Sequence, residues 1–296
     1  MMDIIFCYKM LFDYLTAIFC RNGKPLPGNY VTANKEFSSK YIYHLQSRDI
    51  HGKETLKHLS GQYFFPETFF SREKFSSAET DSMFFLKNSN HDNGKGIKLL
   101  TYENVPPIIP LNHIVQPVIN SLLYYKRKFD IRVLVCVRRD CEIMIYKNLL
   151  YQINPNIFVE QNSNNADIKY YITNRQFHED STLSFFHKTH PEEFDTEHYL
   201  RQLAEIIPLI FTKLLTIANS GYHDELENSY IFGGLDFLPQ KEDNRLFFLE
   251  LNVTPGWSKA LGIENYQEFY QLATEFILGR DKNTDECIYI SRSDFI

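Results

Sequence analysis

The alternation of hydrophobic and polar residues is most regular in two apolar, aromatic-rich segments toward the C-terminal end, 230–238 and 245–252. Between them lies PQKEDN, whose proline, aspartate and asparagine favour a turn, so the pattern predicts a β-hairpin. Successive side chains of a strand point to opposite faces, which sorts the second segment into two sets. One face holds Phe247, Leu249 and Leu251, and the other holds Phe248, Glu250 and Asn252.

Asp236 lies on the first strand of this hairpin, opposite or diagonal to Glu250 and Asn252. Three oxygen-bearing side chains can therefore converge on one hard cation. Mg²⁺ commonly takes one or two carboxylates and completes its shell with water and phosphate oxygens, which this small set leaves room for. The alternative is that Glu250 and Asn252 form only the solvated face of an edge hairpin.

A second polar constellation follows a short strand at 83–86. That strand delivers Lys87, and after a polar loop Gly94 and Gly96 bracket Lys95 before another strand begins at Ile97. Glycines let backbone N–H groups approach phosphate oxygens, and lysine adds mobile positive charge. An ordinary hairpin turn rich in Asn and Gly has the same appearance.

The string KFDIR, residues 128–132, reads as part of a strand. Alternation places Lys128, Asp130 and Arg132 on one face and turns Phe129 and Ile131 toward the core. Two cations and an acid then share a polar face. The alternative is an exposed strand face with a cross-strand ion pair, which would give the same sequence pattern. Residues 141–151 are predicted to form the antiparallel partner of this strand.

Helical periodicity is clearest over 196–219, where apolar residues recur at helical spacing and Pro208 predicts a kink. A closing helix is predicted over 264–278, followed by a loosely held tail. Near the N-terminus, 4–20 fits a strand and an amphipathic helix, and 31–49 fits a further helix. Together with the strands, these elements predict an α+β protein.

Composition excludes several classes of function. A net charge of -6 argues against broad nucleic-acid binding, and we expect no nucleic-acid partner. Five cysteines without a CxxC pair indicate neither a disulfide framework nor a zinc site and favour a reducing cytoplasm. Asp3, Lys9 and Asp13 interrupt the apolar N-terminal run, so we expect a buried segment and no membrane insertion. We also expect a monomer.

Several of these strings together resemble the tubulin-tyrosine-ligase-like family of ATP-grasp enzymes. GGLDF and FLELN, followed by Pro255, resemble the metal-binding hairpin of that family, and KFDIR matches its phrase in full. GKGI resembles the end of the family's phosphate loop, and YITN resembles its HLTN. The resemblance runs in order from about Val31 to Glu275.

The resemblance implies an ATP-grasp fold with a nucleotide cleft between two antiparallel-sheet lobes and a shortened N-terminal lobe. The corresponding division is a shortened N-terminal lobe at 1–62, a central lobe at 63–120, a C-terminal lobe at 121–280 and a tail at 281–296.

The resemblance also implies roles for individual residues. Mg²⁺ would bind Asp236, Glu250 and Asn252, and catalysis would use Arg132, Asn174 and Glu250. The ATP contacts would come from Lys87, Gly94, Lys95, Gly96, Ile97, Gln116, Pro117, Val118, Ile119, Lys128, Asp130 and Thr173, with Asp130 on the ribose hydroxyls. One departure concerns the acceptor, because Gln152 stands where the family commonly has an arginine that contacts that substrate.

The activity implied is ATP-dependent ligation of an amino acid to a protein or peptide carboxylate through an acyl phosphate. We expect ATP and Mg²⁺ as cofactors and doubt tubulin as the acceptor, because the chain is acidic and Gln152 is neutral. Two alternatives stay open: an ATP-grasp kinase acting on a small molecule such as an inositol phosphate, and a nucleotide-binding module without chemistry.

Overall fold

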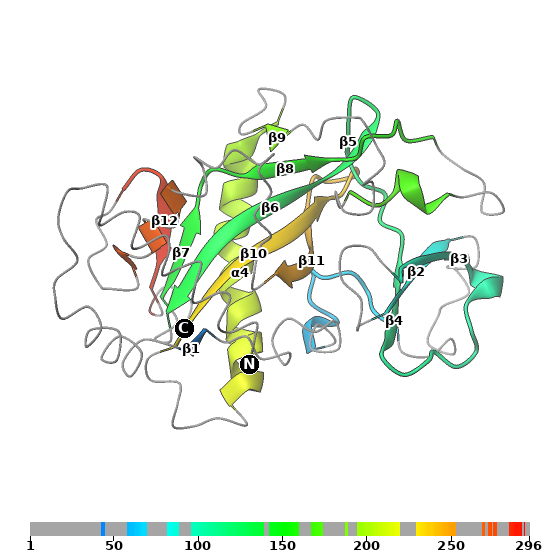
Figure 1. The fold of residues 1–296 in the computed structure, drawn as a ribbon, viewed down its shortest axis with the longest axis horizontal. Helices are drawn as coiled ribbons and strands as arrows, with labels where there is room; N and C mark the ends of the chain where they lie inside the picture. The colour runs from blue at the N-terminus through cyan, green and yellow to red at the C-terminus, as the bar shows by residue number, and fades with distance from the viewer. Residues whose placement is uncertain are drawn as a thin grey trace, which may run out of the picture.

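The computed structural model describes residues 43–44, 58–69, 82–88, 96–138, 142–159, 167–173, 187–188, 194–219, 229–252, 268–269, 272–273, 275–276, 284–291 and 293. These residues form a large sheet, a small antiparallel sheet and a long helix, which agrees with the predicted α+β class (Figure 1). The predicted elements at 4–20 and, apart from residues 43–44, at 31–49 lie outside the described residues. Residues 43–44 form the strand β1 Tyr43–His44, so the helix predicted over 31–49 is wrong at these two positions, where pairing with the strand Ser229–Pro239 overrides local helical periodicity.

The small sheet has the strand order β3-β2-β4. Its members are β2 Met83–Asn88, β3 Lys98–Thr101 and β4 His113–Pro117, with the 3₁₀ turn η4 Tyr102–Asn104 after β3. Alternation along β2 buries Phe84 and Leu86 in a core with Val105 and Val115. Because of the same alternation, Lys87 points to the opposite face of the sheet.

The large sheet is built around two long antiparallel strands, β6 Arg127–Arg138 and β10 Ser229–Pro239. Its other strands are β1 Tyr43–His44, β5 Leu123–Tyr124, β7 Ile143–Tyr146, β8 Leu150–Ile153, β9 His187–Lys188, β11 Leu246–Asn252 and β12 Cys287–Ile290. All pairings in it are antiparallel except that of β1 with β10.

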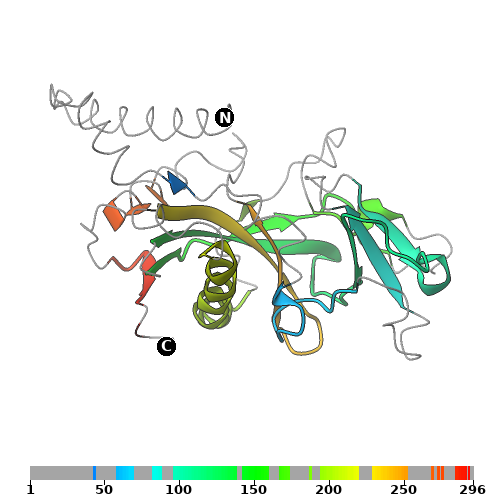
Figure 2. The ribbon, with the colours of Figure 1, turned by 90° about the horizontal axis from the view of Figure 1, so that it is seen from below.

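Helix α4 spans Thr196–Asn219, as the periodicity predicts, and Pro208 lies within it. It crosses one face of the large sheet (Figure 2). Its apolar stripe enters the main core against the inward side chains of β6, β10 and β11, including Leu203, Ile207, Ile210, Phe129, Ile131, Phe237 and Phe248. The prediction that Phe129 and Ile131 of KFDIR face the core is thereby confirmed.

The opposite face of the sheet is covered near β7 and β12. Helical positions at 268–269, 272–273 and 275–276 supply Phe269 and Phe276, which pack on Leu134 and Cys136. β12 pairs antiparallel with β7, so the prediction of a loosely held tail is wrong for 287–290. Apolar burial of Cys287 and Ile290 together with the hydrogen bonds to β7 holds this segment.

Two further local predictions are corrected. The single strand expected over 141–151 is two strands, β7 and β8, which pair with different parts of β6. The sequence also predicts a strand that ends in Thr173 and Asn174, but residues 168–170 form the 3₁₀ turn η5 Ile168–Tyr170. The side chain of Asp167 caps this turn by accepting a hydrogen bond from Lys169 N–H. Such an Asp cap competes with extended backbone.

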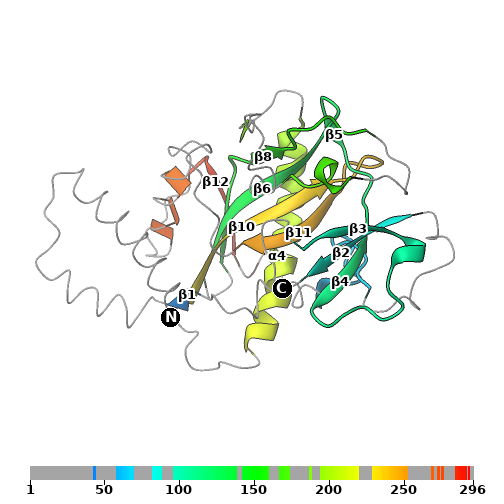
Figure 3. The same cartoon turned by 45° about the vertical axis from the view of Figure 1, so that its right-hand side comes forward.

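The small sheet lies at one end of the large one (Figures 1 and 3). Residues 118–122 connect them, with Val118 N–H bonded to Met83 and Leu122 N–H bonded to Pro239. Residues 58–69 touch both sheets, because Phe69 bridges to Val115 and Phe64 O accepts from Phe248 N–H. No helix in the described ranges has the length and apolar character that a membrane span needs.

Candidate active site

A charged cleft lies where the two sheets meet. Its cavity measures about 140 Å³, and its walls come from β2, β4, β6, β8, β10 and β11 together with residues 171–173. The polar side chains that line it are Lys87, Gln116, Asp130, Arg132, Gln152, Thr173, Asp236 and Glu250. Polar side chains that are up to 163 residues apart in the sequence, Lys87 and Glu250, therefore share one cavity.

β6 supplies Asp130 and Arg132 to the cleft because the residues between and beside them face the core. Lys128 shares their face but is placed differently. Its ammonium group donates to Ser121 Oγ at 2.9 Å and lies 4.4 Å from the centre of the Phe158 ring. Lys128 is buried there and is not among the residues that line the cleft.

The hairpin brings Glu250 to the cleft through an irregularity that simple alternation does not predict. Asp236 pairs with Glu250, but Phe237 pairs with Phe248, so Leu249 is a bulge residue without a partner on β10. Phe248 and Leu251 consequently both belong to the main core, whereas alternation had assigned them to opposite faces. The predicted pairing of Asp236 with Glu250 is nevertheless correct.

Arg132 and Asp236 form a two-pronged ion pair in the cleft. They are register partners on β6 and β10, and the guanidinium meets the carboxylate with Nε–Oδ1 and Nη2–Oδ2 distances of 2.7 Å. Asn252 Nδ2 donates to Asp236 at 3.0 Å and reaches Glu250 at 3.4 Å. This two-pronged geometry fixes the orientation of both charged groups.

Asp130 is a buried acid held by neutral donors. Gln152 Nε2 donates to its Oδ1 at 2.8 Å, and the Thr173 hydroxyl donates to its Oδ2. Burial, reinforced by the negative charge of Asp236, raises the pKa of Asp130 to about 8. Burial and the charge of Asp236 therefore favour the protonated form of Asp130 in the ligand-free cleft, and a bound cation would favour its ionised form.

The donor set suits Mg²⁺ better than a soft metal. Asp236 and Glu250 are hard oxygen donors on neighbouring strands, and Asn252 adds an amide within reach of both. Within the described residues, no three His, Cys, Asp or Glu side chains are grouped for a metal. Because Arg132 occupies both oxygens of Asp236, a bound Mg²⁺ would have to share or exchange those contacts.

The predicted phosphate loop is described in part. Lys87 and Ile97 line the cleft, and Lys87 Nζ lies 5.7 Å from the centre of the Phe85 ring. Gly96 has a φ of 74°, a conformation that favours glycine. Gly94, Lys95 and Asn174 lie outside the described residues.

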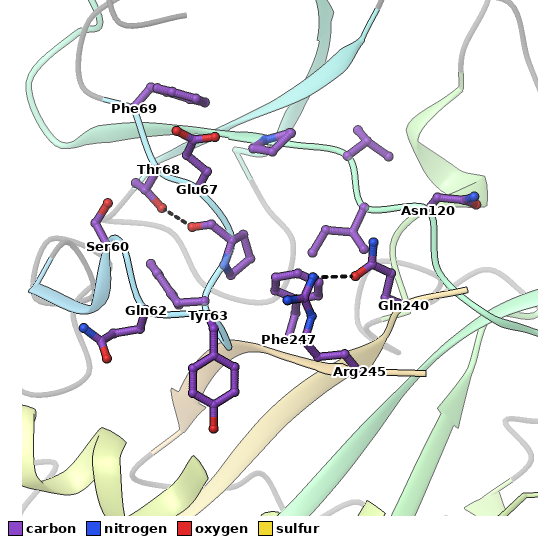
Figure 4. Close-up of a pocket in the computed structure, with 16 residues that line it drawn as sticks. Ser60, Gln62, Tyr63, Glu67, Thr68, Phe69, Asn120, Gln240, Arg245 and Phe247 are labelled. Atoms are coloured by element: carbon purple, nitrogen blue, oxygen red, sulfur yellow. Dashed lines mark hydrogen bonds between the residues drawn. The ribbon is translucent and has the colours of Figure 1, made fainter. Parts of the chain in front are cut away.

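Four of the residues predicted to contact ATP, Gln116, Pro117, Val118 and Ile119, are divided between two hollows. Gln116 lines the charged cleft and donates to Thr68 Oγ1 at 2.9 Å. Pro117, Val118 and Ile119 instead line a larger hollow of about 860 Å³ with residues 60–69 (Figure 4). Arg245, beside Phe247 in this second hollow, bonds Gln240, and the lining lacks the convergent carboxylates of the cleft. We therefore place the chemistry in the smaller cavity.

Sequence reasoning missed the apolar walls of the cleft: Phe85, Ile114, Tyr171, Ile172, Leu238 and Leu249. Phe85 could have been found, because it precedes Lys87 by two positions on a strand and must share its face. Leu249 could not have been found, because only the bulge turns it to the cleft.

Fold and site together define an α+β protein with a charged cleft at the junction of two sheets. A family model described as the tubulin-tyrosine ligase family matches residues 20–272. The match spans most of the chain, so the chain belongs to the tubulin-tyrosine ligase family. The comparison with curated proteins found no match. Members of this family are ligases of an ATP-grasp-like fold that generally use ATP and Mg²⁺, which supports an ATP-dependent enzyme here.

Proposed function

We propose that this protein is an ATP-dependent carboxylate–amine ligase that joins an amino acid to a carboxylate of a protein or peptide. The observation that carries the proposal is the convergence of Arg132, Asp236 and Glu250 with Lys87 in a cleft of a chain from a ligase family. Phosphoryl transfer to a carboxylate needs concentrated positive charge around the phosphates and acids to hold the metal, and this cleft supplies both.

In the proposed reaction an acceptor carboxylate oxygen attacks the γ-phosphorus of ATP, and the bond to the ADP oxygen breaks. The amine nitrogen of the amino acid then attacks the acyl carbon, phosphate leaves, and the nitrogen loses a proton. Asp236, Glu250 and Asn252 would hold Mg²⁺, which offsets the charge of the phosphates.

The remaining roles fall to the chain's own polar groups. Arg132 would contact the transferring phosphoryl group, Lys87 the ATP phosphates and Asp130 the ribose hydroxyls. Gln116 would lie beside the base. Thr173 donates to Asp130 and so would fix the sugar-binding carboxylate. Asn174 would assist at the reacting centre.

A screen for ADP release tests the proposal, with acidic peptides plus each amino acid as one arm and inositol phosphates as the other. We expect Mg²⁺-dependent ADP release that needs both a peptide carboxylate and an amine, with the ligated peptide found by mass spectrometry. Release with an inositol phosphate alone would instead identify a kinase, a result compatible with the neutral Gln152 in the cleft.

A substitution provides the internal control. Glu250→Gln keeps the shape of the side chain but removes a metal-binding charge, so turnover should fall by about a thousandfold with the fold intact by circular dichroism. Turnover near that of the parent would rule out Glu250 as a metal ligand.

A further inference from the structure

Gln152 is one of the neutral polar residues of the charged cleft, and its side chain lies between two acids. Its Nε2 donates to Asp130 Oδ1 at 2.8 Å and reaches Asp236 Oδ1 at 3.4 Å. Gln152 is 8% exposed and is the register partner of Asp130 on the neighbouring strand β8. A single amide group therefore spans from one carboxylate to the other.

This arrangement gives the glutamine a task within the protein. Two buried carboxylates repel each other, and an NH₂ group placed between them offers each a hydrogen-bond donor. Arg132 already fixes Asp236 with two hydrogen bonds of 2.7 Å. Among the described residues no guanidinium is hydrogen-bonded to Asp130, whose Oδ1 accepts from Gln152 and whose Oδ2 accepts from Thr173.

We propose that Gln152 is a positioning residue of the nucleotide site, which holds Asp130 oriented for the ribose hydroxyls, rather than part of the acceptor-binding surface. This inference rests on the proposed ATP site. It differs from the sequence-based expectation that position 152 addresses the acceptor, because the amide is already directed at Asp130 and Asp236.

The proposal predicts a specific defect in sugar recognition. Gln152→Met keeps the length and the approximate volume of the side chain but removes both hydrogen-bonding groups. Asp130 Oδ1 then faces Asp236 without a donor, and the carboxylate is no longer held toward the sugar. In the parent, the ribose hydroxyls donate to the charged Asp130 carboxylate, and hydrogen bonds to charged groups are strong. Because 2′,3′-dideoxy-ADP lacks both hydroxyls, the parent should bind ADP about thirtyfold more tightly than this analogue.

The experiment measures Mg²⁺-supported binding of ADP and of 2′,3′-dideoxy-ADP by calorimetry. In Gln152→Met we expect the ratio of the two affinities to fall to about threefold or less, with dideoxy-ADP binding nearly unchanged. Gln152→Leu serves as the second variant if the methionine form folds poorly. Gln202→Leu is the matched control, because Gln202 also uses its amide for internal hydrogen bonds, to Asn244 O and Leu246 N–H.

Each outcome separates the inference from the proposed function. A Gln152 variant that keeps the parent's ratio, or that loses both ligands with its fold intact, overturns the inference alone. An equal drop in the Gln202 control would show general loosening and would also overturn it. A parent protein that binds neither nucleotide overturns the ATP site, and the inference falls with it.

Discussion

Asp130 shows how burial sets the chemistry of a single residue. Its pKa of about 8 means that the folded, ligand-free protein keeps a proton that the unfolded chain releases near pH 4. The folded state binds more protons between these two pH values, so stability falls as pH rises through that window. The contribution of Asp130 is complete at low pH and is lost as pH approaches 8.

Asp130→Asn should remove this dependence, because asparagine stays neutral at every pH. As the pH rises from roughly 5 to 8, we expect the free energy of unfolding of the variant, relative to that of the parent, to increase by about 3–4 kcal/mol. Urea unfolding without nucleotide or Mg²⁺ measures it. A difference that stays constant with pH would mean that Asp130 is already ionised in the folded protein.

Arg132 is the second residue whose role can be tested separately. Its proposed partner is the transferring phosphoryl group, so Arg132→Ala should lower kcat by about a hundredfold or more and change ADP affinity by about threefold or less. Single-turnover kinetics and ADP titration make the comparison. Weaker ADP binding with an unchanged kcat would make Arg132 a ground-state contact. Thermal unfolding checks that Asp236, which loses its guanidinium partner, does not destabilise the fold.

At the scale of elements, the β10–β11 hairpin is where packing and chemistry depend on each other. Gly233 on β10 lies against the end of β11, and a Cβ there would be 2.8 Å from Leu251 Cδ1 and 3.2 Å from Asn252 O. A side chain at this position therefore requires the Leu251 side chain to move and the backbone at Asn252 to give by a few tenths of an ångström.

Gly233→Ala should therefore cost about 1–3 kcal/mol of stability and weaken Mg²⁺-dependent ADP binding more than binding without the metal. Calorimetric titrations with and without Mg²⁺, together with urea unfolding, measure the two effects. An unchanged free energy of unfolding would show that β10 and β11 accommodate the added methyl group without loss of stability. An equal loss in both titrations would show that the displacement does not reach the acids.

At the scale of the whole molecule, net charge bears on the choice of acceptor. The chain carries a net charge of -6, so it does not attract a polyanionic tail over long distances. We propose that tubulin is a poor acceptor and expect kcat/KM with a polyglutamate peptide to stay level or rise as salt increases from about 0.05 to 0.3 M. A steep fall with salt would reveal a local cationic path that guides acidic acceptors.

The sequence alone identified the elements whose signal is local. Helix α4 and the paired strands of the hairpin follow from periodicity and turn residues, and Asp130, Arg132, Asp236 and Glu250 follow from alternation and motif. In each case the period of the backbone determines which side chains share a face.

Only the tertiary structure decided features that depend on neighbours distant in the sequence. The Leu249 bulge reverses the alternation of β11, Phe158 covers the ammonium group of Lys128, and β12 joins the sheet through β7. Gln152 lies between Asp130 and Asp236 for the same reason, because β8 and β10 pair on opposite sides of β6. A strand's own residues determine its period, but its register and its partners depend on the packing of the whole chain.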